Sequence, residues 1–90
     1  MLNQVVLVGK LKYVIPLASD ERLILLSIEV LDPSGISYRI PVVASSLTYS
    51  DKFFAGGYDN AIGVKGYLFV KNSVLHVRAD KINLLGRSTK

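Results

Sequence analysis

Cations and aromatic rings alternate along one short segment of the chain, at Lys65, Tyr67, Phe69 and Lys71. Because successive side chains of a strand point to opposite faces, these four residues share one face of any strand that contains them. The other face is then apolar or small, as a core requires, and consists of Val64, Gly66, Leu68 and Val70. An exposed row of this kind suits a single nucleic-acid strand, since lysines contact phosphates and rings stack on bases. The alternative is that the two rings pack beneath a loop or in a subunit interface.

The segment that follows adds two basic side chains beside that row. His76 and Arg78 are two positions apart in the sequence and therefore point to the same face of a strand. If that strand neighbours the first one, they can extend the same surface. Arg78 could instead form an ion pair with Asp80 or Glu29. A single exposed histidine is usually an ordinary surface residue.

Further candidate contacts lie near the N-terminus. Lys10 and Lys12 point to the same face of the predicted first strand, and Tyr13 follows them. We expect these three residues to contact phosphates and a base. Lys52, beside Asp51 in a predicted helix, is interpreted as an ordinary solvated side chain.

The residue types that catalysis needs are present but not arranged for it. The seven acidic residues form no convincing acid–base pair: Asp20 and Glu21 lie in a predicted loop, and Asp32 lies in a predicted turn. The chain has one histidine and no cysteine, so neither thiolate ligands nor a histidine cluster can hold a metal. A phosphate-binding Gly-x-x-x-x-Gly-Lys motif is missing. We therefore expect no enzymatic activity, no cofactor and no metal.

Length and composition favour one small all-β domain. Half of the 90 residues are hydrophobic (50%), and most of these are valine, isoleucine or leucine. Such a composition favours strands over helices. We expect a single domain over residues 1–86 and a flexible tail over residues 87–90. The net charge of +4 either attracts a polyanion or merely maintains solubility. The longest apolar runs are too short to span a bilayer, and a basic signal-peptide start is missing, so we expect a cytoplasmic protein.

Hydrophobic alternation and turn residues predict five strands and one short helix. The predicted strands are Leu2–Lys12, Leu23–Leu31, Ile36–Val43, Ala61–Val70 and Val74–Leu85. The predicted connections are a loop over Tyr13–Arg22, a turn over Asp32–Gly35, a helix from Ser45 or Ser46 to Ala55 ended by Gly56 and Gly57, and a turn over Lys71–Ser73. Three strands, a helix and a final hairpin are the order of the OB fold, a five-stranded Greek-key barrel.

Several residues have predicted roles within that barrel. Gly9 marks a bulge or a sharp bend in the first strand, and Pro41 marks an edge or a bulge in the third. Leu47 is predicted to share a helix side with Phe54. One of Phe53 and Phe54 is expected to cap the barrel.

The first predicted strand is apolar on both faces. Val5 and Leu7 occupy one face, while Val6 and Val8 occupy the other. One face can enter the core, and the second then favours a contact with another subunit.

The opening segment Met1–Leu11 resembles the first strand of the bacterial single-stranded DNA-binding protein family, whose pattern is Asn-x-Val-x-Leu-Val-Gly-x-Leu. Weaker similarities follow in order at Tyr38, at Leu47, at Val64–Leu68 with its glycine, and at Ile82–Gly86. The resemblance spans nearly the whole chain. Primosomal replication protein N, a dimeric relative with one short OB domain and a similar length, is the nearest alternative within the group.

This resemblance implies an OB barrel that binds single-stranded DNA as a homodimer or homotetramer, in replication, repair or recombination and near the nucleoid. It implies that Tyr38 is a binding aromatic, with Arg39 on the opposite face of the strand. It also implies a subunit interface along the first strand at Asn3, Gln4, Val6 and Val8. The chain departs from the family in its short hairpins, its lack of tryptophan and its lack of an acidic tail, so recruitment of other proteins by such a tail is not expected.

Two alternatives to DNA binding remain open from the sequence. The barrel could be a protein–protein assembly module whose outer aromatic residues form the partner interface. It could equally be an RNA-binding or primosome component, because OB surfaces accept either sugar.

Overall fold

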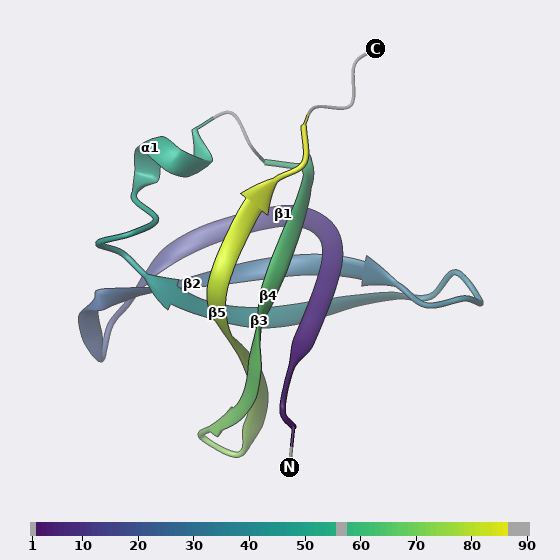
Figure 1. Cartoon of the computed structure of the whole chain (residues 1–90), viewed down its shortest axis with the longest axis horizontal. Helices are drawn as coiled ribbons and strands as arrows, with labels where there is room; N and C mark the ends of the chain where they lie inside the picture. The colour runs from purple at the N-terminus through teal and green to yellow at the C-terminus, as the bar shows by residue number, and fades with distance from the viewer. Residues whose placement is uncertain (1, 56–57, 87–90) are drawn as a thin grey trace.

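Five β-strands close into a barrel in a computed structural model of the chain, which describes residues 2–55 and 58–86. The elements are β1 (Val5–Leu17), β2 (Asp20–Leu31), β3 (Ser37–Ser45), α1 (Asp51–Phe54), β4 (Ala61–Lys71) and β5 (Val74–Leu84). Neighbouring strands follow the order β1-β2-β3-β5-β4, and β4 pairs back onto β1 (Figure 1). All pairings are antiparallel except that of β3 with β5. This strand order confirms the predicted OB fold.

β1 forms the barrel closure because it pairs with two strands in succession. Its first half, from Val5 to Lys10, pairs with β4, and its second half, from Lys10 to Leu17, pairs with β2. A register shift between Leu11 and Tyr13 bends the strand between these two pairings. The predicted bulge therefore lies just after Gly9 and not at it.

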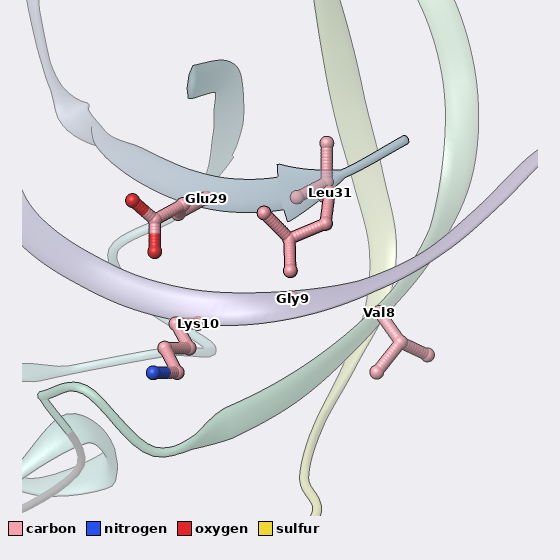
Figure 2. Close-up of a pocket in the computed structure, with 6 residues that line it drawn as sticks. Val8, Gly9, Lys10, Glu29 and Leu31 are labelled. Carbon is pink, nitrogen blue, oxygen red and sulfur yellow. The ribbon is translucent and has the colours of Figure 1, made fainter. Parts of the chain in front are cut away.

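Gly9 instead permits a close approach of β1 to β2. A Cβ atom at this position would lie 2.3 Å from the carbonyl oxygen of Glu29, far inside contact distance. Figure 2 shows Gly9 at the place where the two strands pass, with Lys10 and Glu29 on one side of it and Val8 and Leu31 on the other.

The predicted loop over Tyr13–Arg22 is wrong, because both adjoining strands extend through it. Pro16 pairs with Ile24, and only Ala18 and Ser19 turn the chain between β1 and β2. The polar residues that suggested a loop lie at the start of β2. There the Asp20 carboxylate accepts hydrogen bonds from the backbone N–H and the guanidinium of Arg22.

The barrel interior is filled by aliphatic side chains from every strand and by one ring from α1. The core residues are Leu11, Ile24, Leu26, Ile28, Val42, Ala44, Phe54, Ile62, Val64, Val77, Ala79 and Ile82. Phe54 is 1% exposed and confirms the prediction that a phenylalanine caps the barrel. In the described part of the chain, no helix is long and apolar enough to cross a membrane.

The helix is shorter than predicted, and its packing partner is different. α1 begins at Asp51, so Leu47 precedes it and is 84% exposed instead of sharing a buried side with Phe54. Tyr49 takes the expected place of Leu47. Its ring packs edge-on against Phe53, and its hydroxyl accepts a hydrogen bond from the Ile82 N–H at 3.0 Å. The predicted stop at Gly56–Gly57 and the predicted tail over 87–90 lie outside the described residues.

Both predicted turns are confirmed. In the β2–β3 connection, the Gly35 N–H donates to the Asp32 carbonyl at 2.9 Å. In the β4–β5 connection, Asn72 and Ser73 have φ angles of 52° and 65°. A two-residue hairpin with both central φ angles positive matches the right-handed twist of its strands.

Gly66 lies where β5 comes closest to β4. A Cβ atom there would lie 1.8 Å from the Arg78 carbonyl oxygen, beside a register shift between Lys65 and Gly66. Gly66→Ala should therefore lower the free energy of unfolding by about 3 kcal/mol, since the backbone must move to relieve the overlap. Urea denaturation measures this change.

The matched control for Gly66→Ala is Gly63→Ala in the same strand. There the nearest atom to a new Cβ is Leu85 Cδ1 at 3.4 Å, an ordinary contact with a side chain. Equal unfolding free energies for the two variants would contradict the assigned role of Gly66.

Candidate nucleic-acid interface

The outer face of the β4–β5 hairpin brings aromatic and basic side chains into direct cross-strand pairs. Tyr67 lies opposite Arg78, and Phe69 lies opposite His76. Opposed residues of an antiparallel pair project to the same face and contact each other. The parity predicted from the sequence therefore places these four residues on one surface, which we call the hairpin face.

Tyr67 and Phe69 differ in how much of the ring is free. Tyr67 is 41% exposed. Phe69 is half-buried because its ring packs against the His76 imidazole, with centroids 5.5 Å apart and planes tilted by 44°. His76 Nδ1 lies 2.9 Å from the Val74 carbonyl oxygen. Since a carbonyl only accepts hydrogen bonds, Nδ1 carries the proton, and this contact holds the imidazole against Phe69.

The two lysines of the predicted row lie at its ends. Lys65 is exposed and opposes Lys81, while Lys71 is half-buried and opposes Val74 at the turn. Lys81 was not predicted as part of this face. Simple alternation from Arg78 assigns Lys81 to the other face, but Asp80 is the extra residue of the bulge and reverses the parity.

The inner side of the hairpin departs from the prediction. Val64 and Gly66 are buried as expected, but Leu68 and Val70 are 40% and 66% exposed. The prediction that these two residues face the core is wrong, because the hairpin extends past the end of the barrel (Figure 1), where no strand of the described residues lies opposite it.

Arg78 connects the hairpin face to the next strand. It is half-buried, and it lies beside Val43 of β3 in the short parallel pairing. Among the described residues Arg78 forms no ion pair with Asp80 or Glu29, the two partners considered from the sequence.

A second group of basic residues crosses the β1, β2 and β3 strands. Lys10 opposes Glu29, which in turn opposes Arg39. Arg39 Nη1 lies 3.5 Å from the Ser27 hydroxyl, and the Glu29 carboxylate accepts a hydrogen bond from Ser37. This row is cationic at both ends and anionic at its centre, so it is a weaker phosphate surface than the hairpin face.

The two remaining tyrosine candidates occupy different positions. Tyr13 opposes Ser27 and is 43% exposed, so its ring lies on the outer surface. Tyr38 is 49% exposed near the β2–β3 turn, and its hydroxyl donates to the Asp32 carboxylate at 3.1 Å. Hydrogen bonds from Ser34, Ile36 and Tyr38 lower the pKa of Asp32.

Lys12 is held by a carboxylate. Its Nζ lies 2.5 Å from Asp59 Oδ1, and Asp59 also donates its N–H to the Leu11 carbonyl at 2.7 Å. Asp59 adopts a positive φ of 65° there. The hydrogen bond from Lys12, followed by its charge, lowers the pKa of Asp59. A phosphate must therefore compete with Asp59 for Lys12.

The residues expected at a subunit interface lie around the start of β1. The Asn3 side chain is occupied within the chain, because its amide both donates to the Leu68 carbonyl and accepts from the Leu68 N–H, each at 2.9 Å. Gln4 is exposed. Val6 and Val8 are 71% and 58% exposed on the outer face.

The acidic and histidine side chains that the structure describes form no cluster suited to a metal ion. Within residues 2–55 and 58–86, no group of three or more histidine, cysteine, aspartate or glutamate residues could hold a metal ion.

The structure is similar over nearly its whole length to two solved proteins that bind single-stranded DNA. A small single-stranded DNA-binding protein from Mycoplasma pneumoniae has a TM-score of 0.76 at 18% identity, with 99% of this chain and 100% of that chain covered. The mitochondrial single-stranded DNA-binding protein Rim1 from S. cerevisiae has a TM-score of 0.71 at 16% identity, with 99% and 100% covered.

A third similar structure is the dimeric N-terminal domain of PriB protein from Thermoanaerobacter tencongensis. Its TM-score is 0.68 at 25% identity, with 94% of this chain and 98% of that chain covered. The sequence matches no protein-family model and no curated protein. The three structures confirm, at the level of the fold, the resemblance found in the sequence.

The contact between Lys12 and Asp59 has a measurable consequence. In Lys12→Gln the Asp59 pKa should rise toward its ordinary value, since the charge-assisted hydrogen bond from the Lys12 ammonium group and the charge of that group are both lost. Carbon-13 NMR titration of the carboxyl groups measures this shift.

Asp20 is the internal control, because its own pKa is lowered by Arg22 and should not move in Lys12→Gln. Because folding lowers the Asp59 pKa, the contact with Lys12 stabilises the folded protein at pH values above the unfolded-state pKa of Asp59. This stabilisation is lost as the pH falls through the folded-state pKa of Asp59. An unchanged Asp59 midpoint in the variant would exclude the contact in solution.

Proposed function

We propose that this protein binds single-stranded DNA without strong sequence preference and without catalysis, as a homo-oligomer, in replication, repair or recombination. The observation that carries the proposal is the hairpin face, where Tyr67 opposes Arg78 and Phe69 opposes His76. Rings stack on bases of any identity, and cations neutralise phosphates. Such a face therefore binds a single strand whatever its base sequence.

The electrostatics of the chain support a polyanionic partner. The net charge is +4, and Lys65 and Lys81 add two opposed ammonium groups to the hairpin face. Like charges on directly opposed strand positions repel each other. A phosphate bound between the two ammonium groups would offset their repulsion, so this pair favours the binding of an anion.

The exposed half of β1 supports self-association. From Val5 to Gly9 its edge away from β4 has no strand partner in the described part of the chain, and Val6 and Val8 are exposed beside it. An unpaired strand edge flanked by apolar side chains is a template for a second strand. A symmetric pair of β1 strands would cover both edges at once. The similar PriB domain is described as dimeric.

A protein–protein module is the second candidate function. The observation that favours it is the set of exposed apolar side chains on the β4–β5 hairpin, namely Leu68, Val70, Val74 and Leu75. An apolar patch that is not covered in the monomer commonly marks a protein contact.

Titration of the protein with oligo-dT, the matching duplex and an RNA of equal length separates these functions. We expect micromolar or tighter binding of the single DNA strand that weakens as salt rises, because phosphate contacts release counterions. Tighter binding of the RNA would assign the protein to RNA instead. Failure to bind any of the three at low salt would refute the proposal and favour the protein module.

Tyr67 is predicted to stack on a base. Tyr67→Ala should weaken binding of oligo-dT by roughly 5- to 100-fold, the range expected for one lost stacking platform. Tyr67→Phe keeps the ring and should retain most of the affinity. Fluorescence anisotropy with a labelled oligonucleotide measures both variants, and equal losses would mean that the hydroxyl acts and the ring does not.

Val6 is predicted to lie in the contact between copies. Val6→Glu places a charge in that contact and should shift the protein toward monomer in multi-angle light scattering, since an unpaired buried carboxylate is costly. Leu47→Glu is the control, because Leu47 is 84% exposed in the segment between β3 and α1. A wild-type protein that is monomeric at every concentration would contradict the proposed oligomer.

A further inference from the structure

β3 and β5 lie side by side for only a short distance. Their parallel pairing consists of Val42 with Val77 and Val43 with Arg78. Toward the N-terminal ends of both strands they separate, and the β2–β3 and β4–β5 hairpins extend in different directions (Figure 1). α1 closes the opposite end of the barrel with Phe54.

The space between the two hairpins is an apolar cleft of about 480 Å³. Its apolar walls come from β1, β3, β4 and β5 and include Val5, Leu7, Ile40, Leu68, Leu75 and Val77. A volume of this size, with mostly apolar walls and few polar groups, is typical of sites for small molecules.

Pro41 explains why β3 and β5 do not pair across this cleft. It lies in the cleft wall, immediately before Val42, where the pairing begins. A proline has no N–H to donate, so the pairing cannot continue through it toward the hairpin ends. The cleft is therefore a consequence of the sequence of β3.

The only side chains in the cleft wall that can be charged are basic. Arg39 and His76 line it, and its described wall contains no acidic residue. Arg39 is exposed. His76 also stacks on Phe69, so one imidazole belongs to both the cleft and the hairpin face. The cleft and the proposed DNA surface are thus continuous.

We propose that the cleft receives an unstacked nucleobase of the single strand that follows the hairpin face. The base contacts the apolar walls at Leu68 and Leu75, and Arg39 and His76 face the adjoining phosphates. The inference rests on the proposed function and specifies it, because it assigns bases to two environments: stacked on the hairpin face and inserted between the hairpins. Removal of an unstacked base from water favours the insertion, and the positive charge of Arg39 in the cleft wall matches the charge of the strand.

The test compares oligo-dT with an oligonucleotide of equal length that carries abasic residues, on wild type and on Leu75→Ser. Leu75 is 57% exposed, so this variant should fold. We expect it to bind oligo-dT about fivefold more weakly or worse, the scale of one apolar side-chain contact, and to bind the abasic strand like wild type. Leu68→Ser, from the neighbouring strand, should behave in the same way. Leu84→Ser is the control, since Leu84 is 41% exposed on β5 and outside the cleft.

The outcomes separate this inference from the proposed function. If wild type binds neither strand at low salt, the proposed function fails. If wild type binds oligo-dT and Leu75→Ser binds it equally well, or loses affinity for both strands equally, the insertion of a base is refuted while DNA binding stands. If Leu75→Ser changes only the mass in light scattering, the cleft is instead a contact between copies, and the inference is overturned.

Discussion

The double pairing of β1 is the constraint on which the other features of this barrel depend. One strand pairs with β4 through its first half and with β2 through its second half, and it can do so only because it bends between the two. The bend needs the close approach at Gly9, where even a methyl group would overlap the Glu29 carbonyl. It also needs the bulge after Leu11. With the barrel closed in this way, β4 is paired with β1 and β5 with β4, and their hairpin projects beyond the barrel with one face free.

Sequence reasoning succeeded where alternation continued unbroken. Alternation placed Tyr67 and Phe69 on one face of β4, and His76 and Arg78 on one face of β5, because it is a local property of the chain. It failed where a bulge reversed the parity, so Lys81 was not recognised. It also failed for Leu68 and Val70, because alternation says which face a residue occupies but not where the barrel ends.

The errors at the two connections have a different origin. Polar residues and Pro16 suggested a loop before β2, yet a two-stranded ladder at a barrel edge accepts them with their side chains in solvent. In the segment before α1, Leu47 and Tyr49 were equally available to cover the core. Tyr49 does so because its hydroxyl satisfies the N–H of Ile82, a contact over 33 residues of sequence that no local pattern contains. The oligomer and the DNA contacts stay predictions, now attached to defined surfaces.

The contact of Asn3 with Leu68 has a consequence for the motion of the β4–β5 hairpin. Beyond Gly66 the hairpin receives little stabilisation from packing against the core, because Leu68 and Val70 are exposed on its inner side. There the side-chain amide of Asn3 makes the two hydrogen bonds that a neighbouring strand would otherwise make, one with the N–H and one with the carbonyl of Leu68. The outer part of the hairpin can therefore open on its own while the barrel stays folded, and protection from amide exchange should decrease along β4 from Val64 toward Lys71. The hairpin face lies within this outer part of the hairpin, so a strand bound along it would contact residues that can move relative to the barrel.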